Sequence, residues 1–141
     1  MAQSIVWRIV RYVFAAYYLY VGICLALSLL GMIPPLHLKL SPASASFQAA
    51  LAQTGFVDPA LAAIYVASAI ALFFERTAPL GVVLLAPVMV IIFLTDTLLD
   101  TAWIWGTLHS ATLAALAWHY RSAYRPLWSY GTSSASQTSN A

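Results

Sequence analysis

Four long runs of apolar residues alternate along this chain with short polar breaks. The runs cover residues 12–32, 57–74, 80–99 and 102–120, and the first contains no charged residue. A helix that crosses a bilayer needs about 20 mostly apolar residues, and these runs meet or approach that length. The pattern therefore predicts an all-α protein, an integral membrane four-helix bundle in which each run crosses the membrane.

Helix-breaking residues follow the first run, and a polar tail closes the chain. Pro34 and Pro35 cannot continue a helix, so we expect the first helix to end just before them. Residues 131–141 are rich in Ser and Thr and have no apolar period. We predict that this tail is disordered and that residues 1–130 form a single transmembrane domain.

The segment between the first two runs, residues 36–56, mixes polar residues with Phe47 and Leu51. Such a mixture is typical of a short amphipathic helix that lies at the membrane surface, and Ser46 to Gln53 fits one. A plain extended loop accounts for the same composition. Both interpretations stay open on the sequence.

The composition supports lipid as the solvent of this protein. Hydrophobic residues make up 62% of the 141 residues and charged residues only 7%, whereas soluble domains have about 45–50% and about 25%. These values argue against a soluble enzyme and a disordered chain. The net charge of +2 offers no basic face for nucleic acid, and the lone Cys24 cannot form an internal disulfide.

The basic residues predict the orientation in the membrane. Cytoplasmic loops of membrane proteins are enriched in Lys and Arg. Four crossings place five of the six basic residues on the side of the two termini: Arg8, Arg11, Arg76, Arg121 and Arg125. We therefore expect both termini to be cytoplasmic, with Lys39 alone on the opposite side.

Small residues at steps of four predict where the helices approach one another, since small side chains allow close packing in lipid. The predicted seams are Ala63, Ala67 and Ala71 in the second run, Gly106, Ser110 and Ala114 in the fourth, and Gly22 and Ala26 in the first.

Polar and aromatic residues recur at helical spacing inside the runs. If these stripes face one another, the bundle contains a polar cavity that suits a small head group with hydrogen-bonding oxygens, such as a quinone. Alternatively, the same side chains are satisfied by neighbouring helices and leave no cavity. The residues that we expect to line such a cavity are Tyr17, Tyr20, Tyr65, Asp96 and His109.

Asp96 is the sharpest of these candidates, because an acid inside a span costs about 2.5–3.5 kcal/mol on insertion scales and marks a functional hypothesis. The turn at Asp100 makes the third and fourth helices antiparallel neighbours, so Asp96 and His109 can approach each other. Their pairing would give either a proton relay or quinone anchor, or a structural hydrogen bond. No spacing typical of a metal site supports these residues as ligands.

Two segments carry a resemblance to a known family. The stretch PLGVVLLAPVMV at residues 79–90 resembles the third-helix signature of DoxX-like membrane proteins. The ending YRSAYRPL at residues 120–127 is similar to their C-terminal boundary motif. The resemblance implies a small four-helix protein of the bacterial inner membrane. Members include the membrane subunit of thiosulfate:quinone oxidoreductase and proteins tied to catechol or quinone detoxification.

The resemblance implies a membrane subunit that supports quinone-linked redox metabolism or detoxification beside other membrane subunits. We expect no catalysis by this chain alone, and a quinone as the one cofactor. The chain departs from the family at Tyr65, where relatives often carry an acid, and at Ile91 and Asp96, where they often carry Asn and His. The alternative is a structural accessory subunit that binds no ligand.

Overall fold

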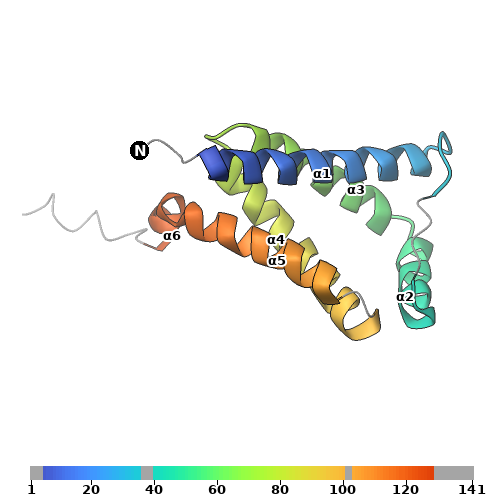
Figure 1. Cartoon of the computed structure of the whole chain (residues 1–141). Coiled ribbons are helices and arrows are strands. Elements are labelled where there is room, and N and C mark those ends of the chain that lie inside the picture. The colour runs from blue at the N-terminus through green and yellow to red at the C-terminus, as the bar shows by residue number, and fades with distance from the viewer. Residues whose placement is uncertain (1–4, 36–39, 101–102, 129–141) are drawn as a thin grey trace, which may run out of the picture.

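The computed structural model describes residues 5–35, 40–100 and 103–128 (Figure 1). Within these ranges the chain is helical and contains no strand, which confirms the all-α prediction. The elements are α1 (Ile5–Leu29), α2 (Pro42–Gln53), α3 (Val57–Phe73), α4 (Ala78–Leu94), the π-helical turn η1 (Thr95–Leu99), α5 (Trp103–His119), the 3-10 turn η2 (Arg121–Tyr124) and α6 (Arg125–Trp128). The predicted disordered tail lies outside the described residues.

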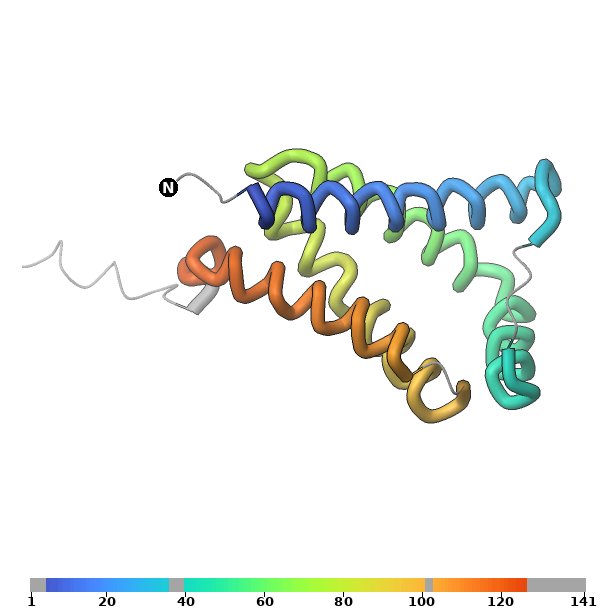
Figure 2. Tube along the Cα trace, in the orientation of Figure 1, coloured from blue at the N-terminus to red at the C-terminus, as the bar shows by residue number. Residues whose placement is uncertain are grey.

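The long helices pack in sequence order, with α1 on α3, α3 on α4, and α4 on α5. Figure 2 shows the start of α1, the α3–α4 turn and α6 at one end of the molecule, which we call the terminal end. The helix α2 and the turn η1 lie at the opposite end. Toward that opposite end, α1 and α5 diverge from each other (Figure 1).

Among residues 5–35, 40–100 and 103–128, two helical segments are long and apolar enough to cross a membrane: α1, and the continuous segment Ala78–Leu99 that joins α4 to η1. A third qualifies if α2 and α3 count as one span, although they are bent by 95°. The helices α3 and α5 have 17 residues each, slightly fewer than the usual 20.

The helix α1 begins earlier and ends earlier than the first apolar run. It starts at Ile5 rather than residue 12 and stops at Leu29 rather than residue 32. Gly31 adopts a φ of 71°, which ends the helix in a left-handed turn. The Gly31 amide donates to Ser28 and the Met32 amide to Leu27, a hydrogen-bond pair that terminates helices at glycine. The glycine, not the later prolines, therefore stops α1.

The segment after α1 contains a helix, so the interpretation as a plain extended loop is wrong. The helix α2 begins at Pro42, four residues before the predicted start, because the Ser41 hydroxyl caps it by accepting from the Ser44 amide at 3.1 Å. The Ser41 amide donates to Asp100 Oδ1 at 3.3 Å, and its hydroxyl donates to the Leu99 carbonyl. These bonds attach the start of α2 to the end of η1.

Three glycines allow the closest approaches between helices. A Cβ at Gly22 of α1 would lie 2.9 Å from Tyr65 Cβ of α3, and one at Gly81 of α4 would lie 2.8 Å from the Ser68 carbonyl of α3. A Cβ at Gly106 of α5 would lie 2.8 Å from Asp96 Cβ. The predicted close packing at Gly22 and Gly106 is therefore confirmed.

The predicted alanine seam of α3 is wrong. Ala63 and Ala67 are exposed and Ala71 is half-buried. Because α3 packs on α1 along one side and on α4 along the other, its buried face is a different one, formed by Ala62, Tyr65, Ser68, Ala69 and Leu72. In α5, the predicted seam residue Ala114 is likewise exposed.

Candidate functional site

Three of the five predicted site residues belong to one cluster of rings between α1, α3 and α5. The Tyr17 ring lies 5.0 Å from the His109 ring, and Tyr65 joins the group through Tyr18 at 5.4 Å. Trp105 lies 4.7 Å from His109. We call this group, completed by Phe14, the aromatic cluster; its members are Phe14, Tyr17, Tyr18, Tyr65, Trp105 and His109.

The backbone of α1 explains why these rings meet. Its buried residues Arg11, Ala15, Tyr18 and Gly22 follow one another at steps of four, three and four, which is one face of an α-helix. Because Gly22 has no side chain, α3 approaches closely and brings Tyr65 beside Tyr18. No comparable close approach is needed between α1 and α5, since large rings bridge them.

His109 has a defined hydrogen-bonding role in this cluster. Its Nδ1 lies 3.0 Å from the Trp105 carbonyl one turn earlier in α5. A carbonyl oxygen can only accept, so Nδ1 carries the hydrogen, and Nε2 of the neutral ring is then an acceptor. His109 is half-buried, and Tyr17 beside it is 37% exposed. The cluster therefore presents an edge with an imidazole acceptor and a phenol.

Tyr18 is the buried centre of the cluster, and the site prediction did not include it. It is 2% exposed, and its hydroxyl donates to Met89 Sδ of α4 at 3.0 Å. A thioether is a weak acceptor, so this hydroxyl is held without a strong partner. The signal was present in the sequence, because Tyr18 precedes the predicted seam residue Gly22 by four positions.

The structure does not bring Tyr20 into the cluster. Its side chain is 62% exposed. Tyr20 follows Tyr18 by two positions, which is about 200° around an α-helix, so the two side chains point to opposite faces.

Asp96 lies beside α5 but makes no direct bond to His109. It occupies the π-helical turn η1, is half-buried and abuts Gly106, with Oδ2 3.1 Å from where a Cβ would be. His109 follows Gly106 by three residues and so lies one turn further on the same face. Both side chains are described, and they form neither a hydrogen bond nor an ion pair with each other. Turns of this π-helical kind often occur at functional sites.

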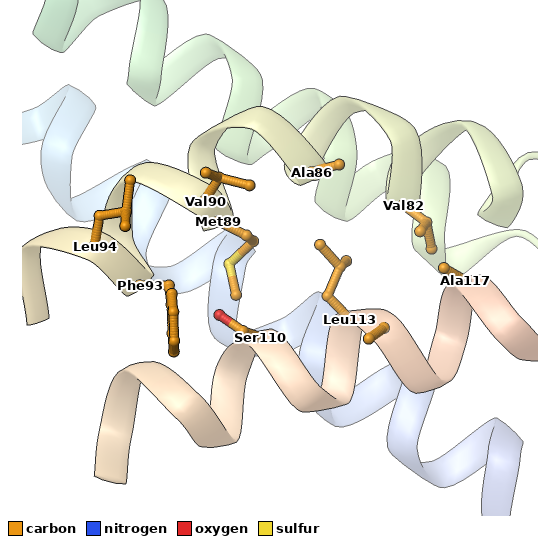
Figure 3. A pocket seen from close by; sticks show the side chains of 10 residues that line it. Val82, Ala86, Met89, Val90, Phe93, Leu94, Ser110, Leu113 and Ala117 are labelled. Atoms are coloured by element: carbon orange, nitrogen blue, oxygen red, sulfur yellow. The ribbon is translucent and has the colours of Figure 1, made fainter. Parts of the chain in front are cut away.

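A groove of about 350 Å³ lies between α4 and α5. Figure 3 shows the side chains of the two helices that face it. They are Val82, Ala86, Met89, Val90, Phe93, Leu94, Ser110, Leu113, Ala114 and Ala117. The groove is apolar apart from the buried Ser110 hydroxyl, which has no hydrogen-bond partner. None of the five predicted site residues lines it, so it is not the expected polar cavity.

Within the ranges that the structure describes, no three His, Cys, Asp or Glu side chains are grouped to hold a metal ion. In comparisons with known proteins, no family model, curated protein or solved structure matches this chain. The arrangement of the site itself is therefore the basis for proposing a function.

Proposed function

We propose that the chain is a multi-pass protein of a bacterial inner membrane, with four crossings and both termini in the cytoplasm. The lengths of α1 and Ala78–Leu99 support this proposal. The 17-residue helices α3 and α5 are about 26 Å long at 1.5 Å per residue. A small mismatch to the ~30 Å hydrocarbon core is tolerated by local thinning of the bilayer.

Two further observations favour this arrangement. The arginines belong to α1, the α3–α4 turn, η2 and α6, all of which meet at the terminal end (Figure 2). The 95° bend after α2 suits a helix that lies in the plane of the membrane surface while α3 crosses. The terminal end would then be cytoplasmic, in line with the positive-inside rule.

Within this membrane protein, we infer a DoxX-like subunit that supports quinone-linked redox metabolism or detoxification. The observation that carries this inference is the aromatic cluster, which joins stacking surfaces to a phenol and an imidazole at a half-exposed edge. Tyr17 would donate to a quinone carbonyl, and His109 Nε2 would accept from a hydroquinone hydroxyl. Asp96 lies against Gly106, one turn of α5 before His109. It would exchange a proton with the His109 imidazole through the bound quinone or through water.

The flat ring of a quinone also fits the remaining surfaces of the edge. Trp105 is 54% exposed and lies next to His109. Aromatic rings stack or meet edge to face at centroid separations of 4.5–7 Å. A lipid-soluble ligand would enter from the side on which α1 and α5 diverge. The reaction itself would belong to a partner subunit.

A structural accessory subunit without a ligand is the second candidate. The internal bond from Tyr18 to Met89 and the tight glycine contacts favour it, because they are the marks of a packed and rigid bundle. In that case the exposed apolar faces would contact other membrane subunits.

Variants of Tyr17, Tyr20 and Asp96 distinguish a quinone-binding subunit from a structural accessory subunit. The chain is purified in mild detergent from quinone-containing membranes, and the retained quinone is quantified by mass spectrometry. Tyr17→Leu and Asp96→Asn should each lower retention about tenfold, the factor that corresponds to ~1.4 kcal/mol of lost contact. Tyr20→Leu removes an exposed tyrosine outside the cluster and should retain quinone like the wild type. Equal retention in all variants, or no quinone in the wild type, would favour the accessory subunit.

A further inference from the structure

A buried arginine at the terminal end lacks an anionic partner. Arg11 is 1% exposed, although arginine is almost never fully buried unless it is paired. Its NH1 group donates to the Tyr120 hydroxyl at 3.3 Å, and its Nε has no hydrogen-bond partner. In the described part of the chain Arg11 forms no ion pair.

Three of the four acidic residues lie at the end opposite to Arg11. Asp58 is in the first turn of α3, Asp96 is in η1, and Asp100 directly follows η1. Glu75 is in the α3–α4 turn and is exposed. A buried cation is costly unless an anion compensates it. The protein therefore holds a positive charge for which its own described carboxylates supply no counterion.

Two further arginines lie close in the chain to Arg11 and to its partner Tyr120. Arg8 lies one turn earlier on α1 and is exposed, and Arg121 directly follows Tyr120 and is exposed. Trp7 stacks on His119, with ring centroids 4.6 Å apart and planes at 17°. This stack holds the turn that carries Arg8 beside the one that carries Arg121.

The ring of Tyr12 lies over the buried guanidinium. The Arg11 Cζ lies 5.0 Å from the centroid of the Tyr12 ring, and Tyr12 is 39% exposed. Apolar side chains lie beside the same turns, since Ile9 of α1 and Trp118 of α5 are both exposed. The Arg121 guanidinium lies over the Trp118 ring, with its Cζ 4.9 Å from the ring centroid.

We propose that the terminal end binds the head group of an anionic phospholipid, with its phosphate between Arg8 and Arg121 and with Arg11 as the buried countercharge. Charge complementarity identifies the head group, because arginine forks match phosphate oxygens. The exposed apolar side chains at Ile9 and Trp118 identify a lipid rather than a free anion, since they offer contacts to acyl chains. This site rests on the proposed membrane location but shares no residue with the aromatic cluster, so a loss of quinone retention and a loss of lipid binding are separate outcomes.

The test measures lipid binding by the full chain in detergent, with native mass spectrometry and thermal unfolding as readouts. Phosphatidylglycerol, phosphatidylcholine and inorganic phosphate are added separately. Each arginine should contribute about fivefold in affinity, which corresponds to ~1 kcal/mol for a basic residue at an anionic membrane surface. The double variant Arg8→Gln/Arg121→Gln should therefore bind phosphatidylglycerol about 25-fold more weakly, and Arg11→Met should also lose binding.

Arg76→Gln is the matched control, because Arg76 is an exposed arginine of the same end but belongs to the α3–α4 turn. It should bind phosphatidylglycerol like the wild type. An equal loss in Arg76→Gln would show diffuse attraction and overturn the site. Equal binding of the two lipids by the wild type would also overturn it, and stabilisation by inorganic phosphate alone would identify a free anion instead. If Arg11→Met does not fold, the double variant Arg8→Gln/Arg121→Gln still tests whether the site binds phosphatidylglycerol.

Discussion

The helix α1 meets α3 and α5 in different ways. Against α3, it presents Gly22, and the backbones come so close that even a Cβ would collide. Against α5, it presents the rings of Trp7 and Tyr17, which reach His119 and His109 across a wider gap. The first interface is close-packed through shape, whereas the second leaves the half-exposed edge at which we propose that a quinone binds.

The largest expected effect comes from breaking the first interface. Gly22→Leu places a side chain where the nearest atoms are Tyr65 Cβ at 2.9 Å and the Val66 amide nitrogen at 3.1 Å. The backbone cannot yield cheaply, so we expect a loss of about 3 kcal/mol or more in the free energy of unfolding. Thermal unfolding in detergent should show a large fall in Tm. Ala67→Leu, on the exposed face of α3, should change the free energy of unfolding by no more than about 0.5 kcal/mol. A loss as large as that of Gly22→Leu would show that the close contact at Gly22 is not the cause.

An intermediate loss of stability is expected at the terminal end, where Arg11 of α1 meets Tyr120 just after α5. Tyr120→Phe removes the hydroxyl that accepts from Arg11 and leaves the buried guanidinium less satisfied. We expect a loss of about 1–3 kcal/mol in stability, measured by the same unfolding assay. The double variant Arg11→Met/Tyr120→Phe should regain much of this loss, because two apolar groups replace a buried polar pair. Additive losses in the double variant would mean that the Arg11–Tyr120 bond is not the cause.

The smallest effect concerns Tyr124, whose hydroxyl donates to the Pro79 carbonyl at 2.9 Å and so holds η2 against the start of α4. Burial, and to a lesser extent Tyr120, raise the pKa of Tyr124 above its ordinary value. The folded state thus holds this proton more tightly than the unfolded state. The resulting stabilisation is complete below about pH 10 and is lost as the pH rises further. Absorbance titration of tyrosinate should lose one step that lies above the ordinary tyrosine range in Tyr124→Phe; an unchanged titration would refute the shift.

The sequence predicted the helices well because apolar runs and helix length are local properties. It misplaced the end of α1, since prolines are conspicuous breakers while Gly31 stops the helix through a hydrogen-bond pattern. It also chose Ala63 and Ala67 as a seam, although a strict step of four drifts around a helix of 3.6 residues per turn. Which face of α3 is buried depends on two neighbours at once, and that is a property of the whole fold.

The candidate site was predictable in part for the same reason. Tyr17, Tyr65 and His109 were predicted to lie together because polar rings are rare in apolar runs, and their rings do belong to one cluster; their binding of a ligand stays a prediction. Tyr18 was missed and Tyr20 was wrongly grouped with them, because the three tyrosines stand so close together that only the register of α1 distinguishes them. A register counted from Gly22, the one position without a side chain on that face, would have selected Tyr18.

The π-helical turn at Thr95–Leu99 has a consequence for how this protein can vary. Such a turn holds one residue more than an α-helical turn, and here it closes with the Asp100 amide on the Thr95 carbonyl at 2.9 Å. Removing Thr95 would restore α-helical winding and leave α4 intact. The Asp96 side chain would then rotate by roughly 100° around the helix axis. At this one place, chain length rather than residue type decides which way a carboxylate faces.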